Sequence, residues 1–223
     1  MTEGTDMLFL VSPPLRWSFQ IASGLFWTLV YILVIKRGFE DRALGMPLVA
    51  LCANISWEFI FSFIYPHDAP QYYVNVVWFL FDVVILVQAI KFGKFDFNRN
   101  LPERLFYPTF ALTLVMSFCA VLLVSREFKD WDGKYAAFGQ NLMMSVMFVS
   151  MLLRRNNLKG QSIYIALFKM AGTLLPSILF FMIYPKLLLL DFLYISIFIF
   201  DLIYFVMLYR KCLEEGVNPW ARI

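Results

Sequence analysis

The sequence predicts an all-α membrane protein with seven transmembrane helices, folded as a single domain over residues 1–223. Of its 223 residues, 61% are hydrophobic and the mean hydropathy is +0.70, whereas soluble domains are about 45–50% apolar. Seven segments each hold about 20 mostly apolar residues, the length needed to cross a bilayer. Apolar and polar residues do not alternate within these segments, which favours helices over a closed β-barrel.

The seven predicted spans follow one another with short polar connections, and no linker is long enough to separate domains. Most of them end at basic residues or at a Tyr-Pro pair. The first span, 17–35, ends at Lys36; the second, 45–64, ends at Tyr65-Pro66; the third, 72–90, ends at Lys91; the fourth, 105–124, lies between Arg104 and Arg126; the fifth, 134–153, ends at Arg154; the sixth, 161–183, ends at Tyr184-Pro185; and the seventh, 187–209, ends at Arg210.

The distribution of lysine and arginine predicts the orientation. The connections after the first, third and fifth spans, together with the C-terminal tail, hold 13 of these residues, and the opposite side holds 5. Because cytoplasmic loops are enriched in positive charge, we expect the N-terminus outside the cell or in the lumen and the C-terminus in the cytoplasm. The net charge of +3 is small and lies in these loops, which argues against a nucleic-acid partner.

An internal repeat is indicated when the chain is shifted by 119 residues. Ile64-Tyr65-Pro66 then matches Ile183-Tyr184-Pro185, and the residues from Phe79 to Asp82 match those from Phe198 to Asp201. In total, 7 of 22 positions are identical. We interpret this pattern as a parallel repeat of three spans, one linking span and three more, with a pocket between the halves near the middle of the membrane.

Glu58 lies within the second span and is the first candidate catalytic residue. A carboxylate in hydrocarbon costs about 2.5–3.5 kcal/mol, so such a group is usually neutralised, paired or placed in a polar cavity. Asn54, Phe61 and Ser62 share its helix face, and Asn54 or Ser62 could orient the carboxyl group. The structural alternative is an ion pair between Glu58 and Lys169.

Asp201 lies in the seventh span and is the second candidate catalytic residue. Its helix face carries Tyr194, Phe198 and Tyr204. Aromatic rings stabilise cations by about 0.5–2 kcal/mol each, so an acid among them suits a site through which a carbocation passes. The structural alternative is a hydrogen bond between packed helices.

A third intramembrane acid, Asp82, follows Trp78 by four residues and corresponds to Asp201 in the repeat. It is a candidate either for the site or for an ion pair with Lys169, which needs an acidic partner at that depth. Gln140 and Gln161 are candidates to line the cavity or to pack between helices. Acids among so many aromatic residues predict proton chemistry on an apolar substrate.

The sequence predicts no metal and no cofactor. It has no acidic cluster of the DDxxD kind that would hold magnesium and a diphosphate, and no glycine-rich phosphate loop. Its single histidine, His67, argues against a histidine-based metal centre.

The chain resembles the membrane-integral terpene cyclases of meroterpenoid and indole-diterpene pathways, the pyripyropene cyclase-like family. The resemblance extends over essentially the whole chain. It is carried by Trp57-Glu58-Phe59 followed by Tyr65-Pro66, by Gly160-Gln161-Ser162 with Lys169, and by Phe200-Asp201-Leu202-Ile203-Tyr204. It implies that Glu58 and Asp201 are the two catalytic acids. Trp57 belongs to the first motif, and Phe61 stands where a tyrosine is common in the family.

The resemblance also implies the reaction. A carboxylic acid, Glu58 or Asp201, protonates a terminal epoxide or alkene on a prenylated substrate, and a carbocation cascade closes rings until a proton is lost. The expected partners are a lipophilic prenylated compound, membrane lipid, and a prenyltransferase and an epoxidase of the same pathway. The membrane would be the endoplasmic reticulum in a fungus and the plasma membrane in a bacterium. The alternative is a small-solute transporter of the three-plus-one-plus-three type, for which Pro70-Gln71 is a weak signal.

Overall fold

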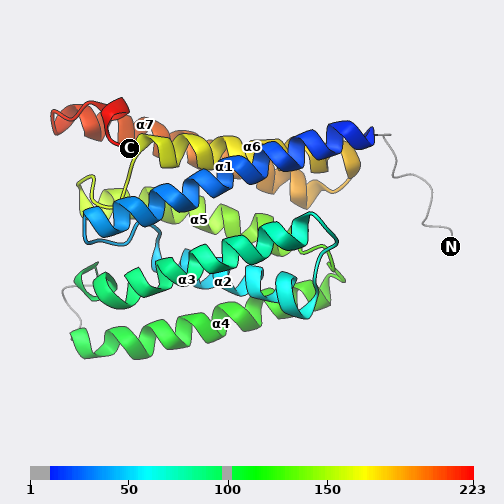
Figure 1. The fold of residues 1–223 in the computed structure, drawn as a ribbon, viewed down its shortest axis with the longest axis horizontal. Coiled ribbons are helices and arrows are strands. Elements are labelled where there is room, and N and C mark those ends of the chain that lie inside the picture. Colours follow the sequence, from blue (N-terminus) through cyan, green and yellow to red (C-terminus); the bar gives the residue numbers. More distant parts are fainter. Residues whose placement is uncertain (1–10, 97–101) are drawn as a thin grey trace.

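The structure is a computed structural model that describes residues 11–96 and 102–223, with the backbone alone for Phe95 and Asp96. The predicted domain, residues 1–223, thus includes segments outside the described part. Within the described part the chain is all-helical (Figure 1). The helices are α1 Pro13–Glu40, α2 Leu48–Phe59, α3 Gln71–Asp96, α4 Phe106–Glu127, α5 Lys134–Arg155, α6 Ile163–Ile183 and α7 Leu188–Glu214.

Each predicted span overlaps one of these helices, but only six helices are long and apolar enough to cross a membrane by the usual criteria. The exception is α2, which has 12 residues and continues into a π-helical turn, η1 Ile60–Ile64. It begins three residues later than the predicted span because Pro47 precedes it in an extended conformation. In contrast, α1 and α7 continue beyond the predicted apolar segments. A helix does not have to end where its apolar residues end, because polar residues form the same hydrogen bonds within the helix backbone.

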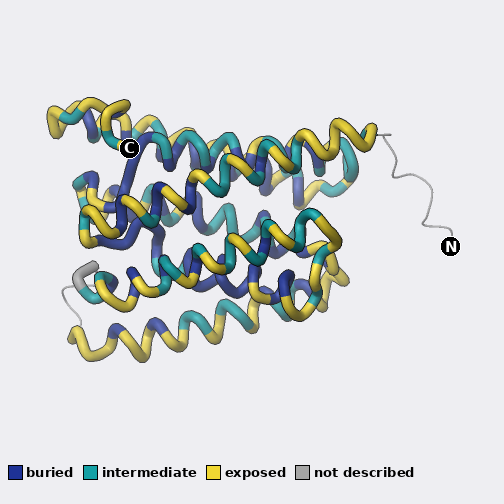
Figure 2. The backbone as a smooth tube through the Cα atoms, in the orientation of Figure 1, coloured by how far each residue is buried: buried dark blue, intermediate teal, exposed yellow. Residues whose placement is uncertain are grey.

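The helices lie side by side along the long axis of the molecule (Figure 1). Helix α1 packs against α3 and α6, and α7 packs against α5 and α6. Helix α2 packs against α3, α4 and α5, and nine of its 12 residues are buried. Residues are buried where helices face one another and exposed on the outside (Figure 2). Many of the exposed residues are large and apolar, as at Leu25, Leu112 and Ile195, which is the pattern expected of a surface in contact with lipid.

The two Tyr-Pro sequences have the same local structure. Tyr65 ends η1 with φ −125° and ψ 65°, and Tyr184 ends α6 with φ −128° and ψ 60°. Proline disfavours the helical conformation in the residue before it, so each pair ends its helix.

Gly133 lies immediately before α5 and contacts residues of α2 and η1. Its φ is +65°, a left-handed conformation that side chains with a Cβ adopt at a cost of about 1–2 kcal/mol. Its carbonyl oxygen accepts a hydrogen bond of 3.0 Å from Trp57 Nε1, and a Cβ at this position would collide with the Phe61 ring.

We therefore expect Gly133→Ala to lower the free energy of unfolding by about 1–2 kcal/mol or more. Unfolding of the purified protein in detergent would measure the change. Gly139→Ala is the matched control, because Gly139 lies within α5 and nothing lies within 4 Å of the added Cβ; alanine there should be neutral or stabilising by up to about 1 kcal/mol. Equal stability of the two variants would contradict this reading.

Candidate functional site

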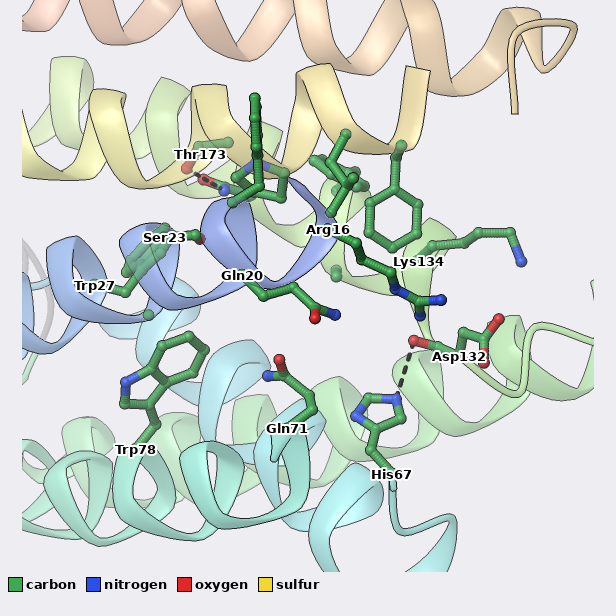
Figure 3. Close-up of a pocket in the computed structure, with 18 of the residues that line it drawn as sticks. Arg16, Gln20, Ser23, Trp27, His67, Gln71, Trp78, Asp132, Lys134 and Thr173 are labelled. Atoms are coloured by element: carbon green, nitrogen blue, oxygen red, sulfur yellow. Dashed lines mark hydrogen bonds between the residues drawn. The ribbon is translucent and has the colours of Figure 1, made fainter. Parts of the chain in front are cut away.

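A cavity of about 610 Å³ lies among α1, α2, α3, α5 and α6 (Figure 3). Its volume is within the range of about 300–1,000 Å³ that is typical of small-molecule sites. It reaches the end of the bundle where α1, α3 and α5 begin and α6 ends. Polar side chains line that end, which we call the mouth: Arg16, Gln20, His67, Asp68, Gln71, Asp132 and Lys134. The other end, which we call the inner end, is lined by Trp27, Tyr31, Asn54, Glu58, Trp78 and Met144.

The inner end contains a buried carboxyl cluster drawn from three helices. Glu58 on α2 is 1% exposed, and the Tyr31 hydroxyl on α1 donates a hydrogen bond to its Oε1. Asn54, one turn before Glu58, donates through Nδ2 to the same oxygen at 3.1 Å. The same Nδ2 donates to Asp82 Oδ2 on α3 at 2.9 Å. One amide group therefore bridges two carboxyl groups.

Lys169 pairs with Asp201 and not with the carboxyl cluster. Its Nζ lies 2.7 Å from Asp201 Oδ1, so the ion pairs expected as alternatives for Glu58 and for Asp82 were both wrong. All three acids and the lysine are buried, and sequence separation alone did not determine which acid the lysine would reach. Among the described residues no lysine or arginine pairs with Glu58 or Asp82. Glu58 Oε2 and Asp82 Oδ1 are buried without a hydrogen-bond partner.

Asp201 lies behind the cavity wall. Lys169 Nζ also donates to Ser145 Oγ at 2.6 Å and to Asn141 Oδ1 at 3.0 Å. Asn141 lines the cavity and donates in turn to Thr173 Oγ1, another lining residue, at 2.9 Å. Asp201 itself does not line the cavity. The ion pair with Asp201 thus holds Lys169 in place, and Lys169 in turn orients the Asn141 amide group on the cavity wall.

The other residues predicted for the site divide into three groups. Trp57, Trp78 and Gln140 line the cavity, and Gln140 Nε2 lies 3.5 Å from Asn54 Oδ1. Phe61 and Ser62 are buried in η1, and the Phe61 ring stacks on His67 with centroids 5.1 Å apart. The third group lies away from the cavity and consists of Tyr194, Phe198, Tyr204 and Gln161.

The three aromatic residues lie on α7 with Asp201, which pairs with Lys169 on α6 and does not line the cavity. Tyr194 packs edge-on against Phe138 at 4.6 Å, and the Tyr204 hydroxyl donates to Gln161 Oε1 at 3.2 Å. Phe198 is 40% exposed on the outer surface. The aromatic residues expected around Asp201 thus do not line this cavity, and the expectation that they face a substrate stays a prediction.

Helix α1 contributes cavity residues that the sequence did not single out. Tyr31 contacts Trp78 and Phe81, with ring centroids 5.9 and 5.8 Å apart, and Trp27 lies next to Tyr31. A signal was present in the first span, where Gln20, Ser23, Trp27 and Tyr31 recur at the spacing of one helix face. All four line the cavity.

His67 is held at the mouth in a fixed orientation. One ring nitrogen lies 3.2 Å from the Asp132 carbonyl oxygen, and the other lies 2.9 Å from Asn75 Nδ2. Burial lowers the pKa of His67, and the Asp132 carbonyl offsets part of this effect. We therefore expect a neutral imidazole at neutral pH, which contributes a hydrogen-bonding surface rather than a charge.

Comparison with known proteins identifies relatives over most of the chain. Residues 9–210 match the family described as Pyr4-like transmembrane terpene cyclases. The Pyr4-family terpene cyclase mfmH of Annulohypoxylon moriforme is 33% identical over 166 residues, which are 72% of this chain and 67% of mfmH. The terpene cyclase macJ of Penicillium terrestre is 28% identical over 73% of this chain and 65% of its own length. The terpene cyclase pyr4 of Aspergillus fumigatus is 27% identical, over 71% and 67%. The chain thus matches about two thirds of each relative's length. No solved structure matches it.

Proposed function

Because the chain belongs to the Pyr4-like transmembrane terpene cyclases, we propose that it cyclises a prenylated compound by protonating the end of the prenyl chain inside the membrane. Its apolar helices and its family make it a multi-pass membrane protein. The observation that carries the proposal is the Glu58 carboxyl group, which is buried, lines the cavity and has no cationic partner among the described residues. A carboxyl group in such surroundings is stable in its neutral form, which is the form that donates a proton.

In the proposed reaction Glu58 donates a proton to a terminal epoxide oxygen or a terminal alkene. The resulting cation is attacked by the double bonds of the folded chain, and each attack forms a carbon–carbon bond. A proton leaves carbon at the end of the cascade and returns to a base in the site. One proton enters the substrate and one leaves, so product and substrate have the same mass.

The inner end of the cavity suits a cationic intermediate. Trp27, Tyr31 and Trp78 line the cavity together with Glu58, and each ring face stabilises a nearby cation by about 0.5–2 kcal/mol. The polar mouth lies at the opposite end (Figure 3). A prenylated compound would therefore enter with its apolar terminus first and leave its polar group at the mouth. Prenyl transfer to an acceptor must supply such a substrate, and epoxidation must precede the reaction if an epoxide is the trigger.

We assign Asp201 an indirect role in this reaction. It holds Lys169, and Lys169 orients Asn141 on the cavity wall. Asp201 is thus a positioning residue in the proposal, and Glu58 is the initiating acid.

We also propose that α2 with η1 is a seventh span and that the N-terminus lies outside or in the lumen. The 17 residues from Leu48 to Ile64 extend about 25 Å, close to the hydrocarbon thickness of about 30 Å. The parallel repeat is supported by the matching ends at Tyr65 and Tyr184. Its contacts also agree, since α1 and α2 both pack on α3, as α5 and α6 both pack on α7.

The proposal is tested with membranes that contain the protein and carry no ion gradient. They are incubated with farnesylated and geranylgeranylated aromatic compounds and indoles, each with and without a terminal epoxide. Chromatography with mass detection should show a new compound of unchanged mass from at least one substrate. If well-folded protein converts none of them but moves one across sealed vesicles, the protein is a transporter and the proposal fails.

A second expected outcome concerns Tyr31, whose hydroxyl donates to Glu58. Tyr31→Phe keeps the ring against Trp78 and Phe81 but removes this hydrogen bond. A hydrogen bond of this kind contributes about 0.5–1.5 kcal/mol, so we expect the rate of product formation to fall by up to about tenfold. Tyr107→Phe serves as the comparison, because it also removes a tyrosine hydroxyl that donates a hydrogen bond, here to the Ile90 carbonyl oxygen, but does not line the cavity. A Tyr31→Phe enzyme that is as fast as the wild type would show that this hydrogen bond does not assist the acid.

A further inference from the structure

We infer that Asp82 and Glu58 act as one proton-sharing carboxyl pair, in which Glu58 presents the proton to the cavity and Asp82 is a positioning residue behind it. The inference rests on the proposed function only for its kinetic consequences. The pair itself is a property of the unliganded protein and can be observed without a substrate.

The carboxyl cluster has too few hydrogen-bond donors for its acceptors. Asn54 Nδ2 carries two hydrogens but has three acceptors within reach: the Tyr31 hydroxyl, Glu58 Oε1 and Asp82 Oδ2. The Tyr31 hydroxyl supplies one more donor, directed at Glu58. Glu58 Oε2 and Asp82 Oδ1 receive none, although both are buried. With both carboxyl groups ionised the cluster lacks a donor, and a retained proton would supply it.

The two carboxyl groups also lie close to each other. The Asn54 amide nitrogen donates to an oxygen of each, at 3.1 Å for Glu58 Oε1 and 2.9 Å for Asp82 Oδ2, so these two oxygens cannot be more than about 6 Å apart. Two carboxylates this close repel each other, whereas one proton held by the pair removes that repulsion. Neighbouring carboxyl groups in other proteins share a proton for the same reason.

None of the described lysine or arginine side chains pairs with either carboxyl group. The described titratable groups that face the pair are Tyr31 from α1 and Cys52 from α2, and Gln140 from α5 lies 3.5 Å from Asn54. Lys169 instead donates to Asp201, Ser145 and Asn141. A shared proton would therefore lower the charge of the pair from two negative charges to one, which no cation in the described part of the chain does.

The cavity separates the roles of the two acids. Glu58 lines it, whereas Asp82 does not and is 0% exposed. In the reaction a proton passes from Glu58 to the substrate, and the proton lost from carbon at the end returns to the pair. The pair carries one negative charge at rest and two after Glu58 has given up the shared proton. The positive charge of the carbocation offsets the second one until a proton returns, so each turnover begins and ends in the same state.

Infrared spectroscopy of the substrate-free protein tests the pair directly, because a protonated carboxyl group has a carbonyl band that a carboxylate lacks. In the wild type we expect such a band, and its loss on raising the pH should reflect both acids together. Removing the neighbouring charge with Asp82→Asn should move the midpoint of this loss to lower pH by about one unit or more, the coupling expected of paired groups. Glu58→Gln should do the same for Asp82 and gives a second test if Asp82→Asn does not fold.

The control is the double variant Lys169→Met/Asp201→Asn, which removes a buried acid together with its partner and should leave the band unchanged. An unshifted midpoint in both Asp82→Asn and Glu58→Gln would overturn the inference.

For the reaction, Asp82→Asn should shift the alkaline limb of the pH–rate profile to lower pH. An equal loss of rate at every pH would mean that Asp82 only supports the fold. If no substrate is converted at all, the proposed function fails while the infrared result still stands.

Discussion

Replacing Glu58 by glutamine is expected to reduce product formation by about 10²–10⁴-fold, the usual contribution of a general acid. Glutamine has nearly the same volume and keeps an oxygen that can accept from Tyr31 and Asn54, so the carboxyl cluster retains its shape. The amide has no proton that it can transfer to an epoxide or an alkene. Wild-type and variant membranes with equal amounts of folded protein would be compared for the rate of product formation.

The control for this variant is a measurement of its unfolding temperature. Glu58→Gln should unfold at the wild-type temperature or above it, because it removes a buried acid that shares its environment with Asp82. A variant that is folded and still forms product at the wild-type rate would remove Glu58 from the mechanism. Asp201 would then be the remaining candidate for the initiating acid.

Replacing Lys169 by methionine should have the largest effect on stability. Lys169 is fully buried and donates to Asp201, Ser145 and Asn141. Removing one partner of a buried ion pair leaves an uncompensated charge and typically costs about 3–5 kcal/mol. We therefore expect a much lower unfolding temperature in detergent and poor recovery of Lys169→Met from membranes.

The double variant Lys169→Met/Asp201→Asn should recover much of that stability, because it removes both charges together. A single variant that is as stable as the double variant would contradict the ion pair. The double variant also separates two roles for Asp201. Measurable product formation would show that Asp201 is not an essential acid, as we propose. A folded double variant without activity would mean that the pair is essential, either directly or because it orients Asn141.

Much of the fold could be predicted because its signals are local. Seven apolar segments, their basic connections and the two Tyr-Pro helix ends are each visible within a short stretch of sequence. The second span was predicted to within three residues at its start, but the sequence did not indicate that its α-helical part, α2, ends at Phe59 and that a π-helical turn follows. Its short α-helical length and its π-helical end are properties of packing that the sequence pattern does not contain.

The site was predicted where its contacts lie within one helix and missed where they lie between helices. Asn54 and Glu58 are one turn apart, so their contact followed from helical spacing. The contact of Glu58 with Tyr31 joins two helices, and no periodicity within either one indicates it. Which of the three buried acids pairs with Lys169 likewise depends on how α5, α6 and α7 pack. Asp201 was predicted to be a cavity residue because its aromatic neighbours on the same helix are visible in the sequence, whereas its pairing with Lys169 is not.

The most direct test of the central claim uses the purified protein in liposomes that contain a single prenylated substrate and no other protein. We expect a product with the mass of the substrate and at least one new carbon ring, formed by the wild type and not by Glu58→Gln. A product of different mass, or equal conversion by the wild type and Glu58→Gln, would contradict an acid-initiated cyclisation by Glu58.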